Sequence, residues 1–250
     1  HSFGNLFLTV MTEITGDFET AIRESSKVLA VRGQVLPATL ENVVLKAELV
    51  DGTIVYGESK ISKSKQPIKR VFLDPVDIKT VPEAINAIVE ADVVILGPGS
   101  LYTSIIPNLL VKDIATAIQK SKGIKIYICN AMTQPGETDH YTASDHIKAI
   151  INHAGNGLID IAVANTETIP ADILERYSEE GAEPVVSDLD NINDLGITPL
   201  GTKIIVKSKV IRHDTMKLAR LVYSISKTHQ FGSTFGWFFS KQIYRFFKGY

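Results

Sequence analysis

Short apolar segments alternate with helical segments from Val71 almost to the end of the chain, and this alternation limits the fold more than any other feature. The apolar segments are DVVILGP (92–98), IKIYICN (124–130), LIDIAVAN (158–165) and KIIVKSKVI (203–211). Apolar residues at helical spacing follow each of them. Alternating strands and helices predict an α/β protein, with a mostly parallel sheet covered on both faces. In such sheets, ligands bind beyond the carboxyl ends of the strands.

The part of the chain before Val71 has a different pattern. Residues 3–14 carry apolar side chains at helical spacing, and Asp17 is a candidate N-cap for a second helix. Residues 33–62 alternate apolar and polar side chains around Asp51-Gly52, which predicts a small antiparallel β insertion. We interpret the basic run from Lys60 to Arg70 as a solvated loop, with contact to an anionic ligand or partner as the alternative.

Composition excludes several classes of protein. The chain has 250 residues, a net charge of −2 and a pI near 6.3, so we expect no nucleic-acid partner. Its single cysteine, Cys129, cannot form an internal disulfide, which suits a reducing cytoplasm. No signal peptide is recognisable, and no apolar run approaches the ~18 residues of a membrane helix. We expect a cytoplasmic protein and, because it begins with His1 instead of Met, a fragment.

The first strand-end loop joins glycines to hydroxyl side chains. Its candidate binding residues are Gly97, Gly99, Ser100, Thr103 and Ser104. Glycines let backbone N–H groups approach a ligand closely, and a helix start presents unpaired donors, so phosphate binding is one interpretation. A serine- or threonine-capped helix after a tight turn is the other, because the spacing is neither GxGxxG nor a P-loop.

The second strand-end loop, residues 130–146, is rich in amides and hydroxyls. Four of its side chains are expected to be exposed and able to read a base, sugar or amide: Asn130, Thr133, Gln134 and Glu137. Thr142 and Asp145 fit a capping box. A metal site formed by Asp139, His140, Asp145 and His146 is the alternative, although no HExxH or CxxC spacing supports it.

Other polar residues near predicted strand ends are less informative. Arg212 precedes the last helix, where its guanidinium suits a phosphate or carboxylate, with a surface pair to an aspartate as the alternative. Asp214 is a candidate N-cap. We interpret Cys129 as a small buried apolar residue instead of a nucleophile. No catalytic triad follows from the spacing, so we assign no catalytic residue and no metal ligand.

Five segments together resemble the YvcK family of the CofD-like superfamily, whose members are labelled gluconeogenesis factors. They are HSFGNLFLTVMTEITGDFETAI, RGQVLPAT, GPGSLYTSIIPNLL, NAMTQPGETDHYTASDHI and VIRHDT. The resemblance covers residues 1–228 and implies a Rossmann-like three-layer α/β fold. It also implies a cytoplasmic regulator that binds UDP-sugars such as UDP-N-acetylglucosamine. The regulated process would be morphogenesis and cell-wall precursor supply during gluconeogenic growth.

The resemblance also implies a binding site and partners. The ligand would contact Gly97, Gly99, Ser100, Thr103, Ser104, Asn130, Thr133 and Gln134. Asn5 and Arg212 are added by their positions in the chain and not by a motif. We expect no cofactor and no turnover, a cell-wall precursor enzyme as partner, and a homo-oligomer. The sister CofD branch is the enzymatic alternative, since it transfers a phospholactyl group from a nucleotide-activated donor with magnesium.

Two features depart from the family pattern. The glycine loop of GGGTG type and the DDGGSS-type stretch that open the family's fold are missing here, so we expect an incomplete gene product. Residues 229–250 form a basic, aromatic tail. This tail suits an anionic membrane surface, but we favour the interpretation that it is foreign or frameshifted.

Overall fold

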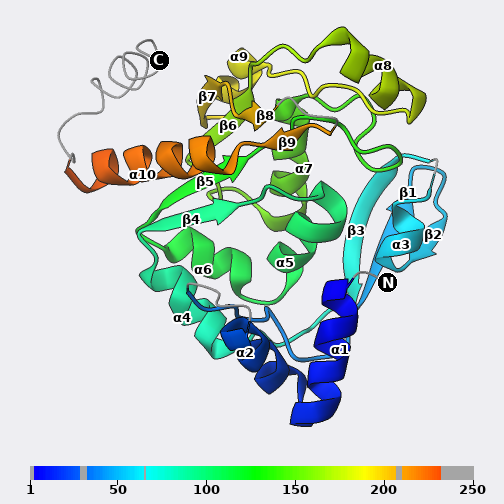
Figure 1. The fold of residues 1–250 in the computed structure, drawn as a ribbon, viewed down its shortest axis with the longest axis vertical. Coiled ribbons are helices and arrows are strands. Elements are labelled where there is room, and N and C mark those ends of the chain that lie inside the picture. The colour runs from blue at the N-terminus through cyan, green and yellow to red at the C-terminus, as the bar shows by residue number, and fades with distance from the viewer. Residues whose placement is uncertain (1–2, 29–32, 65, 207–209, 232–250) are drawn as a thin grey trace.

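The computed structural model describes residues 3–28, 33–64, 66–206 and 210–231. Its central sheet has four parallel strands in the order β4-β5-β6-β7. These strands are β4 (Val93–Leu96), β5 (Ile124–Ile128), β6 (Ile161–Asn165) and β7 (Thr198–Thr202). A separate three-stranded antiparallel sheet lies beside it (Figure 1). The predicted α/β class, with a mostly parallel sheet and a small antiparallel one, is confirmed.

Helices cover both faces of the parallel sheet because the side chains of each strand alternate. On β5, Ile124, Ile126 and Ile128 pack against α10 (Thr215–Phe231), whereas Tyr127 and Cys129 belong to the core on the opposite face. That larger core includes residues of α4 (Pro82–Glu90), α5 (Ile106–Leu110), α6 (Ile114–Lys120) and α7 (Ala143–Ala154). The sheet is therefore buried on both sides, which explains the nearly continuous apolar runs of β5 and β6.

The fourth parallel strand differs from the prediction. The segment KIIVKSKVI contributes only β8 (Ile205–Val206), which pairs antiparallel with β9 (Arg212–His213). The fourth strand is instead β7, with the sequence TPLGT, whose Pro199 lies opposite Ala162 of β6. Proline and glycine are poor strand residues, so the segment TPLGT carries no strand signal. β7 pairs only with β6, and an edge position tolerates a proline because one side of the strand needs no ladder hydrogen bond.

The antiparallel sheet, which we call the β subdomain, spans residues 44–74. Its order is β2-β1-β3, formed by β1 (Val44–Leu49), β2 (Ile54–Tyr56) and β3 (Ile68–Asp74). The predicted hairpin at Asp51-Gly52 is present: Gly52 has φ +86°, and the Thr53 N–H donates to the Asp51 carboxylate at 2.9 Å. The basic run expected to be a loop includes the end of α3 (Glu58–Ile61) and the start of β3, so the sheet continues beyond residue 62 to Asp74.

The remaining helices lie at the edges of this core. α1 (Phe3–Thr15) packs on α2 (Phe18–Val28), and Asp17 caps α2 by accepting from the Thr20 N–H at 2.8 Å, as predicted. α8 (Ala171–Glu179) and α9 (Leu189–Asp194) follow β6. Within the described ranges, no helix is long and apolar enough to cross a membrane. The predicted aromatic tail falls almost entirely on residues 232–250, outside the described residues.

Candidate functional site

The candidate site lies where β4 and β5 end, and its first wall is the loop Gly97–Ser104. Gly97 has φ +82°, and a Cβ there would lie 3.0 Å from the Ile128 carbonyl oxygen of the neighbouring strand. This position therefore requires glycine for both its backbone angle and its close contact. Gly99 is different, because a Cβ there would meet Ser104 Cβ at 3.5 Å and Ile105 Cγ1 at 3.9 Å, both ordinary contacts. The chain then enters one turn of π-helix, η1 (Leu101–Ile105).

Ser100 and Thr103 form a chain of hydrogen bonds that ends on a carboxylate. The Thr103 hydroxyl donates to Ser100 Oγ at 2.6 Å, and the Thr103 backbone N–H reaches the same oxygen at 3.3 Å. The Ser100 hydroxyl in turn donates to Glu137 Oε2. Ser62, at the end of α3, donates to Glu137 Oε1 at 2.8 Å. Three hydroxyl side chains from two distant segments therefore surround one carboxyl group.

Glu137 is buried, with only 4% of its surface exposed, so the expectation that it lies in an exposed loop is wrong. A tight turn holds it, because the N–H groups of Glu137 and Thr138 both donate to the Gln134 carbonyl, at 3.0 and 2.9 Å. The β subdomain covers the turn. Gly136 has φ +82°, and a Cβ there would lie 2.2 Å from the Ser64 carbonyl oxygen. Packing of residues 62–64 against the turn explains the burial.

The second wall is the start of the loop after β5. The Asn130 side-chain amide donates to the Gly99 carbonyl at 3.0 Å, so it joins the two loops directly. It also approaches Gln134 Oε1 at 3.5 Å. Thr133 is buried, with 3% exposed, contrary to expectation, because its backbone and hydroxyl pair with Glu183 at 2.7 and 3.0 Å. Asn130 and Gln134 are partly exposed and remain candidates for ligand contact.

The structure brings most of the predicted site residues together, but not all of them. Gly97, Gly99, Ser100 and Thr103 meet Asn130 at the ends of β4 and β5, and Ser104 is exposed beside them. Asn5 is in α1, and its side chain lies outside what the structure describes.

Arg212 is exposed on β9. Its neighbour His213 donates from Nε2 to the Cys129 carbonyl at 3.1 Å. Side chains alternate along a strand, so Arg212 points to the opposite side.

Two residues at the site escaped sequence reasoning. Ser62 is 75 positions from Glu137 in the chain, and nothing in the basic run around it indicates a contact. His213 stands in the quoted VIRHDT segment, next to the arginine that we selected. Burial lowers the pKa of His213, so the ring is neutral.

The four residues of the alternative metal site have separate structural partners. Asp145 completes the predicted capping box with Thr142, which is confirmed. Asp139 accepts from the Gly136 N–H at 2.8 Å, and His140 pairs with Glu183 at 2.8 Å. His146 is fully buried and donates to a backbone carbonyl. Within the part of the chain that the structure describes, no group of three or more His, Cys, Asp or Glu side chains could hold a metal ion.

Two hollows lie outside the strand-end site. One, of about 260 Å³, is lined by Tyr102, Tyr141 and His153 together with residues of β3 and other residues of α7. The hydroxyls of Tyr102 and Tyr141 are 2.7 Å apart, and burial raises the pKa of Tyr102.

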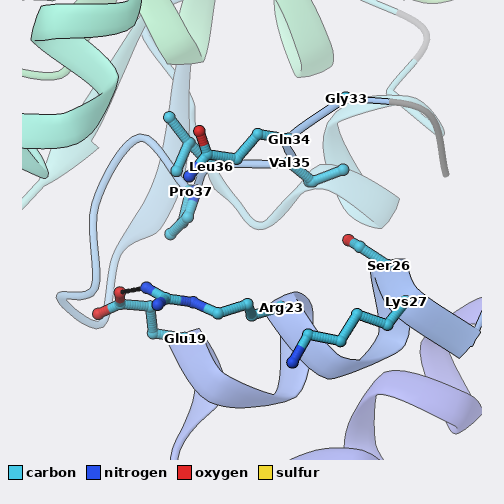
Figure 2. A pocket seen from close by; sticks show the side chains of 9 residues that line it. All are labelled: Glu19, Arg23, Ser26, Lys27, Gly33, Gln34, Val35, Leu36 and Pro37. Atoms are coloured by element: carbon cyan, nitrogen blue, oxygen red, sulfur yellow. Dashed lines mark hydrogen bonds and ion pairs between the residues drawn. The ribbon is translucent and has the colours of Figure 1, made fainter.

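The other hollow, of about 230 Å³, lies between α2 and residues 33–37 (Figure 2). Both cations among its described lining residues are paired, Arg23 with Glu19 at 2.9 Å and Lys27 with Glu24 at 2.6 Å, so neither is free for an anion.

The chain is similar to several known proteins. Residues 1–205 match the CofD family, described as 2-phospho-L-lactate transferase CofD. The chain is 53% identical over 228 residues to the gluconeogenesis factor of Bacillus subtilis, covering 91% of this chain and 72% of that protein. It is 49% identical to the gluconeogenesis factor of Halalkalibacterium halodurans over 223 residues, covering 89% and 69%. A crystal structure of a UPF0052 family member from Bacillus halodurans has a TM-score of 0.85 and 49% identity, covering 89% and 72%.

Proposed function

The chain is a YvcK-like member of the CofD family, and on that premise we propose that it is a cytoplasmic regulatory protein that binds a nucleotide sugar. Its relatives are named gluconeogenesis factors, and this name, together with the family match, supports a gluconeogenesis-related role. The proposed ligand is of the UDP-N-acetylglucosamine type. The proposed role is the control of cell morphogenesis and cell-wall precursor supply under gluconeogenic growth, through a precursor enzyme as partner and with the protein as a homo-oligomer.

The bond between Asn130 and the Gly99 carbonyl carries the proposal. It holds two strand-end loops side by side, so that one ligand can contact both. Hydroxyl and amide groups then line the edge of the sheet where ligands of such folds bind. Ser100, Thr103, Ser104, Asn130 and Gln134 supply polar groups suited to a polyhydroxylated ligand that carries an amide.

Titration calorimetry with UDP-N-acetylglucosamine tests the proposal. We expect saturable heat with a one-to-one stoichiometry and a weaker signal with UDP, because the sugar makes part of the contact. A nucleotide sugar with a purine base serves as a control for the base. Absence of heat at millimolar UDP-N-acetylglucosamine and UDP-glucose would contradict nucleotide-sugar binding by this chain.

A second candidate function is transfer of a phospholactyl group. It is favoured by the family match and by the buried carboxylate of Glu137, for which the described residues provide hydroxyl partners and no ion pair. Magnesium is commonly held by one or two carboxylates together with substrate phosphates, so Glu137 fits this ion. When bound, the ion would neutralise phosphate charge. Incubation with a nucleotide-activated phospholactate and a deazaflavin acceptor tests this function, and absence of a transferred product would contradict it.

A further inference from the structure

Glu137 sets the direction of the hydrogen bonds in the first strand-end loop. A carboxylate has no proton to donate, so both Ser62 and Ser100 must donate to it. A hydroxyl has a single proton, and that of Ser100 is used on Glu137. Ser100 Oγ must then act as an acceptor toward Thr103, whose hydroxyl lies 2.6 Å from Ser100 Oγ and 3.5 Å from Glu137 Oε1, so its proton points inward in either case.

This chain of donors determines which hydrogen-bonding groups the loop offers to a ligand. The hydroxyl protons of Ser100 and Thr103 both point inward, toward Glu137. The two lone pairs of Ser100 Oγ are occupied by the Thr103 hydroxyl and the Thr103 backbone N–H, whereas no described residue donates to Thr103 Oγ1, so Thr103 offers an acceptor to a ligand and not a donor. The negative charge of the carboxylate adds to this effect, because a phosphate at the same oxygens would be repelled by it. Phosphate binding by these hydroxyls is one of the two interpretations of the sequence, and this arrangement favours a ligand group that donates a hydrogen bond over a phosphate.

We propose that Glu137 is a positioning residue that, through Ser100, makes the Thr103 hydroxyl an acceptor for a hydroxyl or amide donor of the ligand's sugar. This inference rests on the proposed function and specifies the orientation of the ligand. The sugar lies against Thr103, and the diphosphate lies away from it. Selectivity for a nucleotide sugar over the bare nucleoside diphosphate follows, since only the sugar reaches this acceptor.

The test compares UDP-N-acetylglucosamine with UDP on three variants of the chain. Glu137→Gln removes the charge at nearly constant shape, and Thr103→Val removes the hydroxyl at nearly constant volume. We expect both to weaken UDP-N-acetylglucosamine roughly tenfold, as for one lost hydrogen bond, and to change UDP less than about twofold. Thr103→Ser, which keeps the hydroxyl, should retain the wild-type affinity for both ligands. Thermal melts confirm that each variant is folded.

Several outcomes would overturn the inference. Tighter binding of UDP-N-acetylglucosamine by Glu137→Gln would mean that phosphates face the carboxylate. Equal losses for UDP and the nucleotide sugar would mean that the loop contacts the nucleotide, and an unchanged Thr103→Val would mean that its oxygen contacts no sugar. If Glu137→Gln does not fold, the comparison of Thr103→Val with Thr103→Ser tests the inference by itself. Wild-type protein that binds neither ligand would instead contradict the proposed function, a result visible before any variant is made.

Discussion

The backbone N–H of Val71, on β3, donates a 3.0 Å hydrogen bond to Nε2 of His153, on α7. The other ring nitrogen, Nδ1, donates to the Ala149 carbonyl at 2.7 Å. One nitrogen accepts and the other donates, so the ring must be neutral. His153 thus ties the β subdomain to the α/β core.

Acid is expected to weaken this connection. Burial lowers the pKa of His153 from its ordinary value near 6.5, and the Ala149 hydrogen bond only partly opposes this. The unfolded chain therefore binds a proton near pH 6.5 that the folded chain still excludes. Stability is fully present above that pH and falls as the pH drops below it. Denaturant titrations between pH 8 and 5 should show this decline.

A variant identifies the contribution of His153 to the pH dependence. His153→Gln removes its titration, so the loss of stability between pH 7 and 5 should become smaller, although the variant is less stable at pH 8 by about 1–2 kcal/mol. His146 and His213 also have pKa values lowered by burial, so part of the decline should persist. An unchanged pH slope in His153→Gln would contradict the assignment.

Gly136 should be far less tolerant of substitution than Gly52, although both have positive φ. Gly136→Ala places a Cβ 2.2 Å from the Ser64 carbonyl oxygen, so the β subdomain must move away from the loop. Gly52→Ala meets nothing within 4 Å and suffers only the backbone strain, about 1 kcal/mol. We expect Gly136→Ala to cost about 3 kcal/mol or more in urea unfolding. Similar losses of stability for both variants would show that the Ser64 carbonyl moves away from the new Cβ at little cost.

Gly97 and Gly99 form a matched pair that separates folding from binding. Gly97→Ala should lower the melting temperature, because its φ of +82° and the 3.0 Å approach to the Ile128 carbonyl exclude a side chain. Gly99→Ala should melt like the wild type, since its Cβ meets only ordinary contacts. If the ligand lies against Gly99, the larger Gly99→Val should abolish UDP-N-acetylglucosamine binding in calorimetry. Retained affinity would make this loop only a turn.

Cys129 should not react while the protein is folded. It is 1% exposed, and burial raises the pKa of its thiol to about 12, so very little thiolate exists at neutral pH. Iodoacetamide at pH 8 should leave the native protein unlabelled by mass spectrometry and should label it fully in guanidinium chloride. Rapid labelling of the native chain would mean that the end of β5 opens readily.

Arg212 and His213 should differ in their effect on the site. His213→Ala removes the bond to the Cys129 carbonyl and should cost about 1 kcal/mol of stability, with weaker ligand binding because the end of β5 is less well held. Arg212→Ala, on the exposed side of β9, should leave stability within about 0.5 kcal/mol. A loss of affinity of tenfold or more in Arg212→Ala would instead place its guanidinium on the ligand.

Local features of the chain were predictable because neighbouring residues determine them. The strands around Ile126 and Val163 follow from runs of branched apolar residues, which suit a strand buried on both faces. The capping box at Thr142 depends only on residues three positions apart. The edge strand at Pro199 was missed because its pairing with β6, and not its own composition, makes it a strand.

The chemistry of the candidate site was decided by the tertiary structure. From the sequence alone, Ser100 and Thr103 are hydroxyls after a glycine turn, equally suited to donate or to accept. Only the fold brings the Glu137 carboxylate onto Ser100 and closes Ser62 over it from the β subdomain. Local sequence determines where a hydroxyl stands along the chain. The direction of its proton depends on which charge is brought beside it, and that requires contacts between segments distant in the sequence.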